Sequence, residues 1–150
     1  MEDILNFVLA AVSSRLHTLY PGTAVYAESI PEELPETCFL IGYTGNQEIH
    51  KELTGRYQVS GTLDIAYYTP NQDPDMRQRL LQTQAFLSLH MPRVTYQGMM
   101  IRLDQHLCRI EDGVLHDLCG FAVWLLESEN AAQIQNILLS LEGDYEQRKV

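Results

Sequence analysis

The stretch QHLCRIEDGVLHDLCGFAVWLL, residues 105–126, decides the fold of this chain. Asp112-Gly113 at its centre is typical of a two-residue hairpin turn, because such a turn needs a positive φ that Asp and Gly tolerate. Pairing then runs back from the turn along both flanking segments. The stretch therefore predicts a long antiparallel hairpin with strands at Gln105–Ile110 and Val114–Leu126.

The register of this hairpin gathers four candidate metal ligands on one face. If Glu111 faces Val114, Cys108 opposes Asp117, and the next pair on the same face brings in a histidine and a second cysteine. A histidine, two cysteines and an aspartate are residue types that bind zinc. The candidate metal site consists of His106, Cys108, Asp117 and Cys119.

Core packing is the preferred interpretation of the same four residues. Their face also carries five apolar side chains, and free cysteines are ordinary components of a core. Directly opposed residues also converge poorly on a tetrahedral ion. We therefore expect no metal and no cofactor, and we expect Asp117 to lie near a sheet end or to be hydrogen-bonded. The apolar residues of the face are Ile110, Leu115, Phe121, Val123 and Leu125.

The remaining strands follow from alternation and turn residues. Arg56–Thr69 alternates clearly and predicts a long strand with one wet side. Thr23–Ala27 and Thr37–Thr44 predict two shorter strands, and Val94–Leu103 predicts a hairpin that turns at Gln97-Gly98. The hairpins together form a four-strand meander. On the long strand the expected inward residues are Tyr57, Val59, Leu63, Ile65 and Tyr67.

Three segments have helical periodicity. Ile4–Tyr20 is amphipathic and stops at Pro21-Gly22. A second helix should open at Asp73-Pro74, with Asp as cap and Pro at the first helical position, and run to about His90. A C-terminal helix is expected at Asn130–Leu141, packed on its own subunit or on a neighbour. The expected inward residues of the second helix are Leu80, Leu81, Gln84, Leu87 and Met91.

This order of elements predicts an α+β fold, a small mixed or antiparallel sheet flanked by two main helices, with an additional C-terminal helix. At 150 residues the chain has the length of one domain. We expect that domain to span residues 1–127, followed by an amphipathic helix and charged tail at 128–150.

Composition excludes several classes of protein. The formal net charge is −10, and the ten basic residues are scattered, which argues against wrapping nucleic acid. Every apolar run is too short to span a bilayer, and the acidic start Met1-Glu2-Asp3 lacks the basic region of a secretory signal. We expect a cytoplasmic protein, or part of a particle assembled there, with its three cysteines as buried free thiols.

The sequence also lacks a nucleophile elbow, a Walker loop, a dinucleotide-binding glycine motif and a zinc-protease helix. We therefore expect no enzymatic activity. The alternatives from another class are a small metal-binding protein or enzyme that uses the last hairpin, and a module that binds a small ligand.

Four segments together resemble the phage tail terminator proteins of prophages in low-GC Gram-positive bacteria. The resemblance covers roughly Ile4 to Leu126, and its succession of segments carries more weight than any one motif. The segments are Tyr20-Pro21 with Val25-Tyr26 and Glu28; Pro35 with Cys38-Phe39-Leu40-Ile41; Arg56-Tyr57 with Leu63-Asp64-Ile65-Ala66-Tyr67-Tyr68; and Asp112-Gly113-Val114-Leu115-His116.

The resemblance implies a structural protein of a long-tailed bacteriophage. Its copies would form a hexameric ring that docks on the last ring of the tail tube, stops tube polymerisation and offers a surface to the neck of the head. The implied partners are the tube protein, the sheath where the tail has one, and a neck or head-completion protein. The implied location is the tail-neck junction of the virion, with assembly in the host cytoplasm. Another neck or tail-completion protein is the alternative within this class.

Two segments are candidates for the contacts of such a ring. The Gly45–Gly55 connection, a long loop or a projecting hairpin arm, could lie against a neighbouring subunit or remain a surface loop. The loop Glu28–Glu36 could line the lumen, where its carboxylates would repel passing genome DNA without binding it. The interface candidates are Ile49, Lys51, Leu53 and Arg56, and the lumen candidates are Glu32, Glu33 and Glu36.

Overall fold

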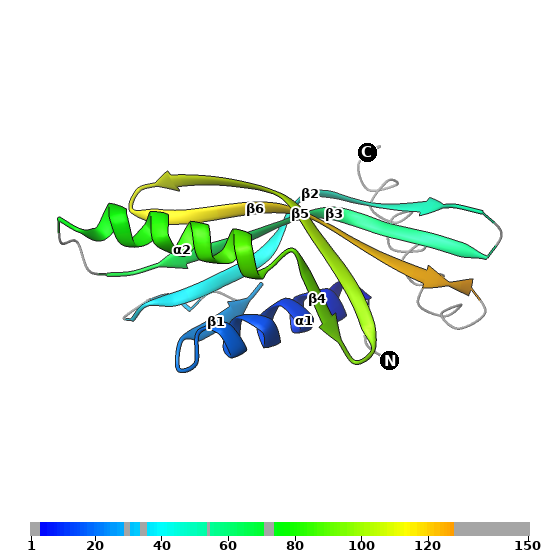
Figure 1. Ribbon diagram of the computed structural model, residues 1–150, viewed down its shortest axis with the longest axis horizontal. Coiled ribbons are helices and arrows are strands. Elements are labelled where there is room, and N and C mark those ends of the chain that lie inside the picture. Colours follow the sequence, from blue (N-terminus) through cyan, green and yellow to red (C-terminus); the bar gives the residue numbers. More distant parts are fainter. Residues whose placement is uncertain (1–3, 29–30, 34–35, 54, 71–73, 128–150) are drawn as a thin grey trace.

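The computed structural model describes residues 4–28, 31–33, 36–53, 55–70 and 74–127. In this part of the chain, one six-stranded sheet and two helices form the predicted α+β fold (Figure 1). The predicted C-terminal helix at Asn130–Leu141 lies outside the described residues. The elements are α1 (Ile4–Leu19), β1 (Ala24–Ala27), β2 (Cys38–Lys51), β3 (Arg56–Tyr68), α2 (Met76–His90), β4 (Arg93–Tyr96), β5 (Met99–Glu111) and β6 (Val114–Leu126).

The sheet has the strand order β1-β2-β3-β6-β5-β4. β1 pairs with β2 in parallel, and every other pairing is antiparallel, so the sheet is mixed. β2 continues to Lys51, well past the expected end at Thr44, because a bulge between Thr44 and Glu48 keeps it paired with β3. The segment expected as a loop or hairpin arm is therefore a hairpin arm.

The predicted meander has three strands where four were expected. β5 runs without a break from Met99 to Glu111, through a bulge between Asp104 and Leu107. Gln105 has a φ of 56° there, so the backbone takes up one extra residue without ending the strand. The predicted turns at Gln97-Gly98 and Asp112-Gly113 are confirmed, and all four turn residues have positive φ.

The hydrophobic core lies between one face of the sheet and the two helices. Val59, Leu63 and Ile65 of β3 are fully buried on this core face, as their alternation predicts, and β6 contributes its odd-numbered residues. α1 packs across the middle of the face, and α2 packs over its end near the β5–β6 turn. The opposite face, which we call the open face, carries no helix among the described residues.

Two predictions for α2 are wrong. The helix begins at Met76 with Asp75 at the N-cap position, so Pro74 precedes the helix. Its buried side chains, Met76, Leu80, Thr83 and Leu87, follow the spacing of one helical face, whereas Leu81 is 45% exposed. Leu81 lies about 100° around the helix axis from Leu80, outside the narrow face that α2 buries.

Candidate functional site

The four residues of the candidate metal site lie at the bulge of β5 and on the facing part of β6. Glu111 pairs with Val114 and Cys108 with Asp117, as the turn predicts. The bulge alters the third pair, because Asp104 pairs with Gly120 and Leu107 with Leu118. Two residues of β5, Gln105 and His106, therefore lie opposite the single residue Cys119.

Asp117 is the centre of this cluster. Its side chain is 0% exposed, and one of its carboxylate oxygens lies 2.8 Å from Nδ1 of His106, whose side chain is 10% exposed. Cys108 donates its thiol to the other oxygen, with Sγ 3.6 Å away. The expectation that Asp117 is hydrogen-bonded is confirmed. These bonds offset the cost of burying a carboxylate and fasten the bulge of β5 to β6.

The electrostatics of the cluster favour hydrogen bonding over metal binding. The hydrogen bond that His106 donates to the carboxylate of Asp117 is the largest effect that raises the pKa of His106, and burial opposes it. Burial, followed by the charge of Asp117, raises the pKa of Cys108 to about 12, and burial also raises the pKa of Cys119. Thiols must lose their proton to bind zinc, so these two are poorly prepared for it. No group of three His, Cys, Asp or Glu side chains in the described ranges has the arrangement of a metal site.

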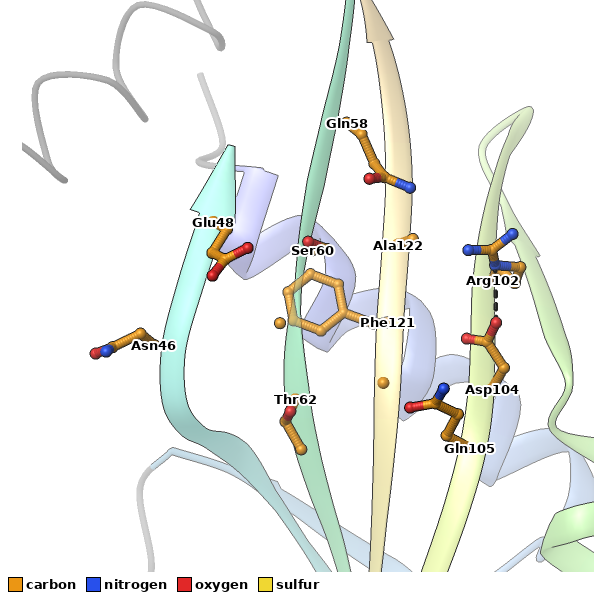
Figure 2. A pocket seen from close by; sticks show the side chains of 12 residues that line it. Asn46, Glu48, Gln58, Ser60, Thr62, Arg102, Asp104, Gln105, Phe121 and Ala122 are labelled. Atoms are coloured by element: carbon orange, nitrogen blue, oxygen red, sulfur yellow. Dashed lines mark ion pairs between the residues drawn. The ribbon is translucent and has the colours of Figure 1, made fainter. Parts of the chain in front are cut away.

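The open face holds a polar hollow of about 410 Å³ between two bulged strands (Figure 2). Asn46 and Glu48 of β2 line one side, and small residues of β3 and β6, such as Ser60 and Thr62, form its floor. On the far side β5 contributes Arg102, Asp104 and Gln105, and Nε of Arg102 lies 3.0 Å from a carboxylate oxygen of Asp104. The lining residues offer hydrogen bonds and one ion pair, which suits surface contact better than covalent chemistry.

Trp124 joins three strands beside this hollow. Its Nε1–H donates to Glu52 at 3.2 Å, and the guanidinium groups of Arg56 and Arg102 lie 5.4 and 5.0 Å from its ring centroid. Glu52 also pairs with Arg56 at 3.1 Å. This cluster was not predicted, although alternation along β6 places Trp124 on the face opposite Val123, and one tryptophan on a wet face is a signal for a contact surface.

A second histidine–aspartate pair lies on the open face nearer the β5–β6 turn. Nδ1 of His116 is 2.9 Å from a carboxylate oxygen of Asp64, and the two side chains are 24% and 29% exposed. Both line a hollow of about 390 Å³ together with Glu28, whose carboxylate accepts the backbone N–H of Tyr43. This pair was not predicted, because its residues are far apart in the sequence.

The four interface candidates are not equivalent in the structure. Ile49 packs partly against the protein's own core, and Arg56 belongs to the Trp124 cluster. Lys51 is exposed above the ring of Tyr57. Leu53 projects from the turn between β2 and β3 with 89% of its surface exposed, so it is the candidate that most needs a partner.

The lumen candidates Glu32, Glu33 and Glu36 belong to the connection between β1 and β2. All three side chains are exposed. Their carboxylates are therefore accessible to solvent and to a binding partner.

The described residues form an α+β domain with polar and aromatic clusters on the open face of its sheet. Among the described residues, the side chains of these polar clusters are hydrogen-bonded, ion-paired or stacked on one another. A family model described as "Phage tail terminator protein" matches residues 8–133. The chain belongs to this family, which gives it a structural role in the assembly of a phage tail and associates it with the virion.

Other comparisons add little. No curated protein matches the chain. One solved structure, labelled only with a sequence identifier, is 13% identical and covers 79% of this chain and 94% of its own, with a TM-score of 0.44. That likeness is too low to support an argument. No helix within the described ranges is long and apolar enough to cross a membrane.

Proposed function

We propose that this protein is the terminator of a long phage tail. Six copies form a ring that caps the tail tube, stops its polymerisation and provides the surface that joins the head. The match to the terminator family over residues 8–133 is the observation that carries the proposal. The surface clusters described above support it, because a capping ring needs built contact surfaces and no reactive groups.

The ring has partners on both sides. One side contacts the tube protein, and the sheath as well if the tail is contractile, and the other side contacts a neck or head-completion protein. The complete ring lies at the tail-neck junction, and its assembly takes place in the host cytoplasm. The domain of residues 1–127 supplies the ring.

The negative charge of this chain suits a ring through which DNA passes. The chain has a formal net charge of −10, and Glu32, Glu33 and Glu36 are exposed. Facing the lumen, these carboxylates repel the phosphate backbone, so the genome passes without specific binding.

Contacts between subunits use the hairpin of β2 and β3. Its candidate residues are Ile49, Lys51, Leu53 and Arg56, with Leu53 the most exposed of them. An apolar side chain at the tip of a projecting hairpin gains stability when a neighbour covers it, at about 25 cal/mol per Å² of apolar surface.

Deleting the gene from the phage tests the proposal. Without a terminator the tubes continue to polymerise, so we expect tails of excessive and variable length and heads without tails. The wild-type gene supplied in trans should restore a single tail length. Tails of normal length in the deletion would contradict the proposal, and normal tails that fail to join heads would indicate a head-joining protein instead.

A further inference from the structure

Two long strands of the sheet are each covered along only part of their outer edge. β1 pairs with the first part of β2, as far as Ile41, and β4 pairs with the first part of β5, as far as Arg102. Within the described ranges, no strand lies on the outer side of β2 at residues 48–51 or of β5 at residues 107–111. We call these two segments the β2 edge and the β5 edge. Such edges offer backbone N–H and C=O groups to another strand.

On the β2 edge, the outward backbone groups belong to Ile49 and Lys51. The N–H of Glu52 donates to the carbonyl oxygen of Arg56, so Glu52 bonds to the neighbouring strand β3. In an antiparallel ladder, every second residue bonds to the same partner strand. The backbone groups of Ile49 and Lys51 therefore point away from β3, toward the open side.

On the β5 edge, the outward backbone groups belong to Cys108 and Ile110. Glu111 and Val114 flank the two-residue turn at Asp112-Gly113, where both φ values are positive. Residues that flank such a turn bond to each other across the hairpin. By the same alternation, the backbone groups of Cys108 and Ile110 point away from β6.

Only a second copy can bring these two edges together. They lie on opposite sides of the sheet and toward opposite ends of the molecule (Figure 1). β2 and β5 run in opposite directions, because each of the steps from β2 to β3, β6 and β5 is antiparallel. Copies placed side by side around an axis can therefore join β2 to β5 as an antiparallel pair. Such head-to-tail contacts can close into a ring, and strands inclined to its axis supply the stagger that the two edges need.

Side-chain direction and charge select one register for this pair. Open-face residues must oppose open-face residues, and at least three pairs must form between the two edges. These conditions place Glu48 opposite either Arg109 or Glu111. The first register joins opposite charges, whereas the second sets two carboxylates against each other, which is destabilising. The first register also places His50 opposite Leu107.

We propose that the β2 edge of one copy pairs with the β5 edge of the next as an antiparallel ladder. The pairs are Glu48 with Arg109, Ile49 with Cys108, and His50 with Leu107. The outer side of β5 is then covered first by β4 and further along by the β2 edge of the neighbour, and the outer side of β2 is covered in the same way by β1 and the β5 edge. This inference rests on the proposed ring and names the strands that join its subunits.

Cysteine cross-linking of the full chain tests this register. In the double variant His50→Cys/Leu107→Cys, the two thiols of neighbouring copies face each other, with Cβ atoms about 5 Å apart. A bifunctional thiol reagent of that reach should link copies into a ladder that extends past the dimer. Both replaced side chains are exposed, so the core stays intact. Wild-type protein should remain uncrosslinked, since Cys38 and Cys119 are buried and the pKa of Cys108 is raised to about 12.

The matched control tests the other register. His50→Cys/Arg109→Cys replaces two exposed residues on the same edges, but in the proposed register they are diagonal neighbours about 7 Å apart. This variant should give far less of the ladder. An equal or stronger ladder from the control, or no ladder from His50→Cys/Leu107→Cys, overturns the proposed pairing.

Charge reversal provides a second test without cross-links. Glu48→Arg and Arg109→Glu should each raise the concentration needed for assembly about fivefold, because each sets like charges opposite one another. The double reversal should restore assembly, and failure to restore it overturns this charge pair. Light scattering of the wild type separates the two proposals. Assembly without the cross-link refutes this contact alone, whereas a strict monomer, even with tail tubes added, refutes the ring as well.

Discussion

The two faces of the sheet each carry a histidine–aspartate pair of nearly equal length, 2.8 Å between His106 and Asp117 and 2.9 Å between His116 and Asp64. The first pair is buried on the core face, and the second is about a quarter exposed on the open face. Water solvates the second pair if either partner is lost, whereas nothing replaces a lost partner in the core. The buried pair, His106 with Asp117, thus stabilises the fold, whereas the partly exposed pair, His116 with Asp64, is available for contacts with other molecules.

The largest expected effect comes from breaking the buried pair. His106→Ala leaves the carboxylate of Asp117 in the core with only the weak thiol donor of Cys108, which should cost about 3 kcal/mol of unfolding free energy. The matched change His116→Ala on the open face should cost less than about 1 kcal/mol. Urea denaturation measures the unfolding free energy of both variants, and equal m-values make the two losses comparable. Equal losses would show that burial does not distinguish the pairs.

Glycines on the two faces give a second comparison. A Cβ added at Gly61 would lie 2.8 Å from the ring of buried Phe121, whereas one at Gly120 would meet nothing closer than a backbone oxygen at 3.5 Å. Gly61→Ala should therefore cost about 2 kcal/mol through overpacking, and Gly120→Ala less than about 1 kcal/mol. Thermal melting of both variants provides the measurement. A Gly61→Ala protein as stable as the wild type would place Phe121 elsewhere.

The buried pair also predicts a pH dependence. The pKa of His106 is raised in the folded protein, chiefly by its hydrogen bond to Asp117, so the pair contributes its full stability below the ordinary histidine value of about 6.5. This contribution is lost as the pH rises through the raised pKa. Unfolding free energies measured between about pH 6 and pH 8 should fall less for His106→Gln than for wild type. Parallel curves for the variant and the wild type would exclude this linkage.

The smallest effect on stability should come from Leu53, in the turn between β2 and β3. Leu53→Asp removes an exposed side chain that holds nothing in its own subunit, so the unfolding free energy should change by less than about 0.5 kcal/mol. Assembly into larger species should nevertheless be lost, as measured by light scattering. Undiminished assembly, with the fold intact by circular dichroism, would exclude Leu53 from the subunit contact.

Local patterns predicted much of this fold. Asp112-Gly113 was enough to predict the turn and the pairing of Cys108 with Asp117, and the alternation after Arg56 identified the inward residues of β3. The β5 bulge was missed, because an extra residue in a strand leaves no distinct sequence pattern. Leu80, Leu87 and Met91 were correctly placed on the inward side of α2, but Leu81 was not, since leucines on both sides of the helix give competing stripes.

The candidate site was predictable only in part. The buried cluster around Asp117 follows from one hairpin register, so sequence alone could bring its members together. The Trp124 cluster and the pair of Asp64 with His116 join residues from separate strands, and their assembly depends on the order β2-β3-β6-β5. Contacts between strands that are distant in the chain follow from topology, which local periodicity does not encode.

High-resolution imaging of the head-proximal end of purified tails tests the proposed ring most directly. We expect a closed ring of six copies of this chain on the last ring of the tube, with the hairpin of β2 and β3 reaching the neighbouring copy. Tails of finished length whose tube ends lack this chain would contradict it.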